Sequence, residues 1–215
     1  MAKLDKTEML ILILILVYCI VAFFLYSRMP ETIATHWNIN GVADGFSPRL
    51  LGILIMPVFF VIIFFIYALF SRSNMFKNAE LKKQLDLTIV LTMLFLFYIS
   101  ILSLIYNVGI HFNFSYFMIP ATSALFIVMG IILMKIKKRN LFFGIRTPWT
   151  IVDDDVWIKT HKLGGWLFII IGITTLVALI YMKYFTIIFF TEIVGLLLIT
   201  FIYSYMLYKK KHKKK

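Results

Sequence analysis

Long apolar blocks divide this sequence, and charged residues are almost absent from them. A helix needs about 20 apolar residues to cross the roughly 30 Å hydrocarbon core of a membrane. Blocks of this length cover approximately residues 9–26, 50–70, 87–106, 116–134, 164–181 and 185–208. Hydrophobic residues make up 62% of the chain and charged residues only 15%, so a soluble fold could not cover this much apolar surface. We therefore predict an all-α integral protein of the cell membrane with six transmembrane helices.

The basic residues predict how these helices are oriented. If both termini are cytoplasmic, all but three of the 22 Lys and Arg residues lie inside, and only Arg28, Arg49 and Lys183 lie outside. The lysine-rich tail at residues 209–215 then lies against the inner leaflet, where anionic lipid attracts it. A cytoplasmic partner is the alternative role for this tail. Despite the net charge of +12, no nucleic acid is expected, because no aromatic residue interleaves the lysines.

The outer loop at residues 28–49 has the composition of an ordered cap. Residues 32–37 are expected to form a short strand, and Asn40-Gly41 is a strong hairpin turn signal. Asp44-Gly45 predicts a second turn. Pro30 and Pro48 bracket the whole segment.

Several residues of this cap are candidates for binding a ligand that arrives from outside. They are His36, Trp37, Asn38, Gly41 and Asp44. The alternative is that Trp37 anchors the loop at the lipid headgroups and His36 satisfies a backbone group. No metal site is expected, because His36 and His111 are too few ligands.

The inner loop at residues 135–163 predicts a cytoplasmic amphipathic helix over about residues 151–163. Thr150 followed by Asp153 resembles a capping box, and the acidic run 153–155 complements the helix dipole. Helix capping therefore accounts for the aspartates, and metal binding or acid–base work is the alternative. Asp155 and Lys159 have the i, i+4 spacing of an ion pair, and Trp157 and His161 share one face at the same spacing. Gly164-Gly165 would turn this helix into the fifth span.

Glu192 is a carboxylate about six residues inside the sixth span. A charge at that depth is costly, so such residues are functional candidates by default. The alternatives are a structural ion pair and a protonated, hydrogen-bonded acid. Arg49, Lys183 and His36 are possible partners, and we hypothesise that Glu192 holds the outer cap onto the helices.

The inner loop resembles the signature of the SdpI family. The residues that carry the resemblance are Asn140, Gly144, Arg146, Thr147, Trp149, Thr150, Trp157, His161 and Gly164. The outer stretch from Met29-Pro30 to Gly45 resembles the small domain of unknown function that precedes this signature. We accordingly assign residues 1–71, with two spans and the outer loop, to one domain. Residues 72–215, with four spans, the motif loop and the basic tail, form the other.

The resemblance implies an integral membrane immunity protein that protects the cell from a secreted peptide toxin. It also implies a receptor that holds a small transcriptional repressor at the membrane. The partners would be the lipid bilayer, the toxin outside and the repressor inside. Arg146 suits a carboxylate or a lipid phosphate, and its alternative partners are the acidic run 153–155 or headgroups.

Two other function classes were weighed against immunity. A transporter that exports a peptide or small amphiphile would show inverted repeats or helices broken at the midplane, whereas Pro57 and Pro120 lie near span ends. An enzyme is not expected, because the sequence has no His-Glu-x-x-His zinc motif, nucleophile elbow or phosphate loop. No cofactor is expected either.

Overall fold

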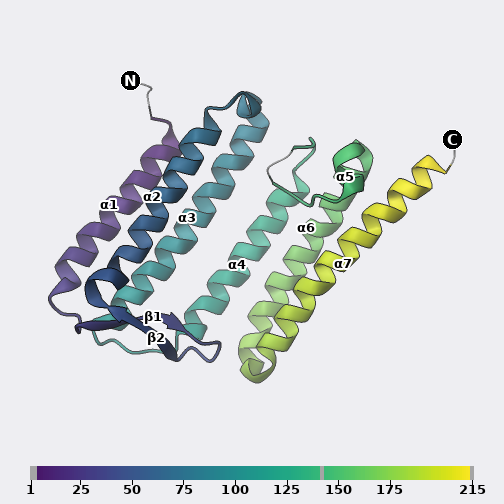
Figure 1. Cartoon of the computed structure of the whole chain (residues 1–215). Coiled ribbons are helices and arrows are strands. Elements are labelled where there is room, and N and C mark those ends of the chain that lie inside the picture. Colours follow the sequence, from purple (N-terminus) through teal and green to yellow (C-terminus); the bar gives the residue numbers. More distant parts are fainter. Residues whose placement is uncertain (1–3, 141–142, 214–215) are drawn as a thin grey trace. The chain divides into compact units, whose positions relative to one another are not determined.

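The computed structural model describes residues 4–140 and 143–213 (Figure 1). Over this part of the chain, five helical stretches are long and apolar enough to cross a membrane. They are Lys6–Tyr26 (α1), Arg49–Ser71 (α2), Ala79–Asn107 (α3), Phe114–Met134 (α4) and Asp154–His212. Leu141 and Phe142 of the motif loop, and the lysines at positions 3, 214 and 215, lie outside the described residues.

The last of these stretches is divided by a kink. It consists of α6 (Asp154–Val177), the 3-10 helix η2 (Ala178–Tyr184) and α7 (Phe185–His212). Tyr181 within η2 has non-helical backbone angles. The two final apolar blocks of the sequence therefore belong to two different helices.

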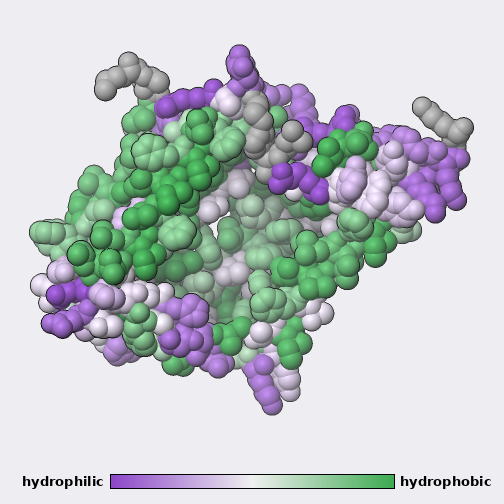
Figure 2. All heavy atoms as spheres, in the orientation of Figure 1, coloured by the Kyte–Doolittle hydropathy of each residue, from purple (hydrophilic) through white to green (hydrophobic). Residues whose placement is uncertain are grey.

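Apolar side chains cover the flanks of the helices, and polar ones gather near the helix ends (Figure 2). Within the most apolar window of each stretch, only 11–22% of the residues are buried inside the protein. Water cannot solvate so many exposed Phe, Leu and Ile side chains favourably, whereas hydrocarbon can. The chain is a multi-pass membrane protein.

The chain forms two compact units, Met1–Met118 and Ile119–Lys215, and the division falls within α4. The assignment of two domains that meet after residue 71 stays a prediction. In the first compact unit, α3 packs with α1 and α2 around the buried residues Tyr18, Phe60 and Met93. Tyr18 also donates a hydrogen bond of 3.0 Å to the carbonyl of Ile53 in α2.

A hairpin in the first unit adds a small sheet to this otherwise helical fold. Strand β1 (Thr32–Trp37) pairs antiparallel with β2 (Ala43–Pro48). The expected strand is confirmed, and so is the turn at Asn40-Gly41, where Gly41 has a φ of 73°. The prediction of a second turn at Asp44-Gly45 was wrong, because both residues lie within β2. Gly45 faces His36, and a Cβ on Gly45 would lie only 2.7 Å from the Cβ of His36.

Polar side chains fasten the hairpin, and the segment of chain that precedes it, to the helices. Asn107, at the end of α3, accepts a hydrogen bond from the Ala34 N–H at 2.8 Å and donates one to the Ala34 carbonyl at 2.9 Å. Arg49, at the start of α2, donates to the carbonyls of Tyr26 at 3.1 Å and Met29 at 2.8 Å. The side chain of Asn107 therefore bonds to β1 as a neighbouring strand would.

In the second unit, α6 runs without a turn through Gly164 and Gly165. The expected bend between a cytoplasmic helix and the fifth span was therefore wrong. The glycines serve helix packing instead, since a Cβ on Gly165 would lie 2.6 Å from the carbonyl oxygen of Gly130 in α4. Ser123 of α4 donates a hydrogen bond to the carbonyl of Gly172 in α6 at 2.5 Å.

Asn107→Ala is expected to loosen the hairpin. The change leaves the buried N–H and C=O of Ala34 without partners, which costs roughly 1–3 kcal/mol. Hydrogen exchange of the Ala34 amide and thermal unfolding of the purified protein measure the effect. Asn40→Ala, at the exposed turn, is the control, and equal protection of Ala34 in both variants would contradict the assignment.

Candidate functional site

His161 of α6 organises the motif loop of the second unit. Its side chain is fully buried. Its Nε2 accepts a hydrogen bond from the Ile145 N–H at 2.9 Å, and its Nδ1 lies 2.8 Å from the carbonyl oxygen of Trp157. Because a carbonyl only accepts, Nδ1 carries the proton and the ring is neutral. Trp157 stacks on the ring with centroids 4.0 Å apart, which confirms that the two residues share a face.

The motif glycines are required by this arrangement. Gly144 has a φ of 104°, and a Cβ there would overlap Nε2 of His161. A Cβ on Gly164 would overlap Cδ1 of Ile145. Both glycines therefore let the loop backbone lie directly against α6.

The threonines and tryptophan of the motif connect the loop to α7. Thr147 caps the short helix α5 (Pro148–Val152) by accepting from the Thr150 N–H at 3.2 Å. Its hydroxyl also donates to Ser204 of α7 at 2.9 Å. Trp149 packs edge-on against Phe201 of α7. The capping box therefore pairs Thr147 with Thr150, and the expected pairing of Thr150 with Asp153 was wrong.

Asp153 separates α5 from α6. Its backbone is extended, and its Oδ1 accepts from the N–H groups of Asp155 at 2.9 Å and Val156 at 3.2 Å. Helix capping is therefore confirmed for Asp153, in the position that follows α5. The expected helix over residues 151–163 is in fact two helices that meet at this residue.

The basic tail contacts the aspartates at the start of α6. Lys211 of α7 lies 3.0 Å from Asp153 and 2.8 Å from Asp155. Partial burial raises the pKa of Asp153, but the hydrogen bonds from Lys211, the Val156 N–H and His212 outweigh it and lower the pKa to about 2. Asp155 thus pairs with Lys211 of the tail, where the sequence suggested Lys159.

Two further motif residues lie at the surface of the loop. Asn140 accepts a hydrogen bond from the Phe143 N–H at 2.9 Å and so shapes the loop entrance. Arg146 is exposed. It is preceded by Ile145, whose N–H is held by His161, so its backbone is positioned by the buried histidine.

The hairpin separates the candidate residues of the outer cap. Nδ1 of His36 lies 2.5 Å from the Asp44 carboxylate on the surface, with side chains 70% and 43% exposed. Trp37 instead stacks on Phe114 at a centroid distance of 4.1 Å. Asn38 accepts from the N–H groups of residues 40 and 42 and so builds the turn. Of the five candidates, His36 and Asp44 are the pair whose side chains meet in solvent.

Glu192 lies partly buried on α7, and its Oε2 has no hydrogen-bond partner among the described residues. The three partners proposed from the sequence make other contacts. Arg49 donates to two carbonyls of the first unit, His36 pairs with Asp44, and the Lys183 ammonium lies 5.7 Å from the ring centroid of Tyr184. The role of Glu192 in holding the cap stays a prediction.

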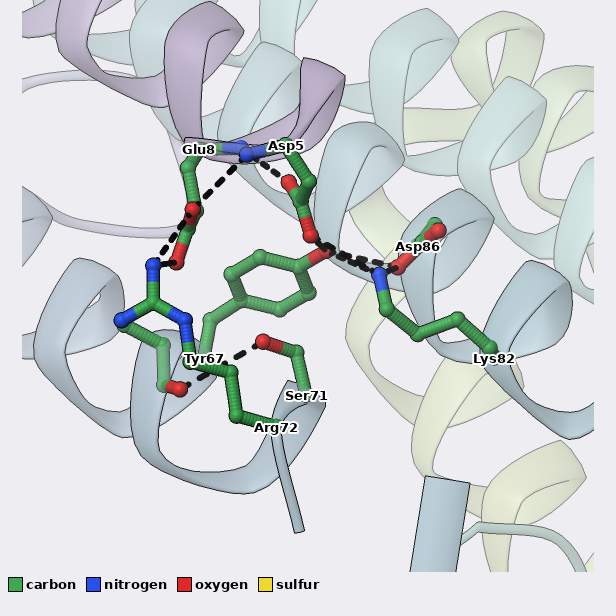
Figure 3. A network of polar contacts seen from close by, with 8 residues as sticks. Asp5, Glu8, Tyr67, Ser71, Arg72, Lys82 and Asp86 are labelled. Carbon is green, nitrogen blue, oxygen red and sulfur yellow. Dashed lines mark hydrogen bonds and ion pairs between the residues drawn. The ribbon is translucent and has the colours of Figure 1, made fainter. Parts of the chain in front are cut away.

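A polar network that the sequence did not reveal joins α1, α2 and α3 (Figure 3). The Lys82 ammonium donates to Asp86 at 2.6 Å, to the hydroxyl of Tyr67 at 2.7 Å and to Asp5 at 3.0 Å. The Tyr67 hydroxyl in turn lies 2.9 Å from Asp5 and 2.7 Å from Asp86. The i, i+4 spacing of Lys82 and Asp86 was the signal available in the sequence.

An ion pair with one buried partner extends this network. The Glu8 side chain is 1% exposed and lies 2.7 Å from the guanidinium of Arg72, whose side chain is 48% exposed. Burial raises the pKa of Asp5, but its hydrogen bonds with the Glu8 N–H, Lys82 and Tyr67 outweigh burial and lower the pKa below its ordinary value. These ionic contacts fix the ends of three helices that otherwise meet through apolar packing.

Gly144→Ala is expected to destabilise the second unit by about 2 kcal/mol or more, because left-handed backbone costs a non-glycine residue roughly 1–2 kcal/mol and the methyl group displaces His161. Thermal unfolding in detergent measures the effect. Gly195→Ala on α7 is the matched control, because a Cβ there would meet nothing within 4 Å. Similar melting temperatures for the two variants would refute this account of the motif.

Lys82→Met is expected to weaken the first unit by roughly 1–3 kcal/mol, because it leaves Asp5 and Asp86 facing each other without the shared cation. The neighbouring Lys83 is exposed, so Lys83→Met changes the same charge without touching the network. Chemical denaturation of the two purified variants compares them. Equal midpoints would show that the network contributes nothing to stability.

Comparison with known proteins relates both loops to described sequences. The SdpI/YfhL protein family matches residues 135–205, which hold the whole motif, and a domain of unknown function, DUF1648, matches residues 13–61. The chain is 27% identical over 207 residues to Immunity protein SdpI of Bacillus subtilis (strain 168), covering 95% of this chain and 97% of that protein. No solved structure matches the chain.

Proposed function

We propose that this chain, which matches the SdpI/YfhL protein family over residues 135–205 and DUF1648 over residues 13–61, is an immunity protein of the cell membrane that protects against a secreted antimicrobial peptide. The observation that carries the proposal is the similarity to Immunity protein SdpI, which extends over 95% of this chain and 97% of that protein. The similarity therefore includes the hairpin and the motif loop together.

The proposal includes six spans with both termini in the cytoplasm. The final apolar stretch has 59 residues. At about 1.5 Å per residue a single helix of that length would be far longer than the membrane is thick. The kink at Tyr181 offers the place where the chain reverses. With all but three basic residues inside, the hairpin lies outside, and the motif loop lies inside.

This topology divides the work between the two loops. The exposed His36–Asp44 pair belongs to the surface that a peptide meets from outside. The motif loop supplies a second surface inside, around Arg146, for a small repressor held at the membrane. Support for an inner docking surface comes from its rigidity, since His161 and Thr147 tie the loop to α6 and α7.

A survival assay tests the proposal. The chain is expressed in bacteria that are sensitive to secreted antimicrobial peptides, and the inhibitory concentration of each peptide in a panel is measured. We expect the wild type to raise that concentration for at least one peptide. His36→Ala should reduce protection, because it removes the exposed contact between His36 and Asp44. Arg146→Ala should retain protection and lose only a transcriptional response.

Immunoblots of membrane fractions match the expression levels, and Lys83→Met serves as a control for loss of one exposed inner charge. Failure of the wild type against every peptide would contradict immunity. Export of a labelled peptide from inverted vesicles would then favour the transporter alternative.

A further inference from the structure

A pocket of about 580 Å³ lies beside the hairpin, within the first unit. Its walls come from the end of α1, the hairpin and the end of α3. Met29 and Ala34 form buried parts of the lining, and Phe46 and Tyr106 contribute aromatic walls. A volume of this size is typical of sites that take a small ligand or a few side chains.

The floor of this pocket is rigid and its polar groups are satisfied. Ala34 is 2% exposed, and both of its backbone polar groups bond to Asn107, which also lines the pocket. The Phe46 side chain, in contrast, is 60% exposed, and Val42 beside it is 57% exposed. Exposed apolar side chains beside an ordered, hydrogen-bonded backbone indicate a surface suited to an apolar partner.

The charged residue of the lining is basic. Arg28 is exposed at the pocket, and among the described residues the lining includes no Asp or Glu. His111 also lines the pocket, with its ring centroid 4.8 Å from that of Tyr106. An arginine offers five N–H donors in a planar fork that matches a carboxylate. The pocket therefore complements a ligand that is apolar and ends in a carboxylate.

We propose that this pocket binds the carboxyl end of a hydrophobic peptide, with the terminal carboxylate on Arg28 and the last side chains between Phe46 and Tyr106. In a peptide whose side chains are apolar, the carboxyl terminus is the anionic group that lies directly beside apolar side chains. The choice of a peptide as occupant rests on the proposed immunity function.

A binding experiment tests the site without cells or toxin. The purified full chain is placed in nanodiscs of phosphatidylcholine, and the probe is a dye-labelled tetrapeptide of alternating leucine and phenylalanine. One form of the probe has a free carboxyl terminus and the other is amidated. Fluorescence polarisation gives both dissociation constants, and empty nanodiscs correct for partition into lipid.

We expect the free-carboxyl probe to bind about tenfold more tightly than the amide, the difference that one charge-assisted contact supplies. Arg28→Gln should remove this difference and leave binding of the amide unchanged. Phe46→Ser should weaken both probes, because it removes an apolar wall. Lys183→Gln, which changes a charge outside the pocket, should behave as the wild type does.

Equal affinity for the two probes, or a preference that survives Arg28→Gln, would overturn the proposal. The survival assay tests the immunity function separately. Binding of the probe without protection would support the pocket and contradict immunity. Protection without binding of the probe would support immunity and contradict the pocket.

Discussion

Buried backbone N–H and C=O groups need hydrogen-bond partners, and where a segment is neither helix nor paired strand those partners must come from elsewhere in the protein. In the hairpin and in the motif loop, side chains of helix residues supply some of these partners. Asn107 bonds to both polar groups of Ala34 in the hairpin. His161 accepts from the N–H of Ile145 in the motif loop. Each loop is therefore held by a helix and not only by its own turns.

The same need for hydrogen-bond partners accounts for the structural role of His161 in the motif. His161 is neutral, buried and stacked on Trp157, and its two ring nitrogens are both used by backbone groups. Gly144 is there because a Cβ would displace that ring. The motif thus specifies a loop shape, and any partner would recognise the surface that this shape presents around Arg146.

Local patterns in the sequence were sufficient for the apolar blocks, the strand over residues 32–37, the Asn40-Gly41 turn and the Trp157–His161 stack. They failed where a distant contact decides the outcome. Asp44-Gly45 has turn chemistry, but Gly45 is needed in a strand because His36 lies against it. The pair Gly164-Gly165 predicted a bend, but Gly165 instead allows α6 to pack closely against α4.

The network at the start of α1 was not predictable for a related reason. Asp5 and Lys82 are brought together by three helices, and nothing in the sequence near either residue indicates the other. The pocket beside the hairpin likewise depends on α3 ending where it does. The sequence therefore indicated which segments hold the candidate residues, whereas the contacts of those residues could be seen only in the folded structure.

The helical extension of α7 as far as His212 gives the basic tail an angular phase. Successive residues on a helix are rotated by about 100°, so the side that Lys211 turns toward Asp153 and Asp155 is set by counting from the membrane. The lysines at neighbouring positions point elsewhere by the same count. Inserting one residue before position 209 would leave the composition of the tail intact yet rotate the helical residues 209–212 about the axis of α7. These four residues therefore depend on their position along the helix as well as on their charge.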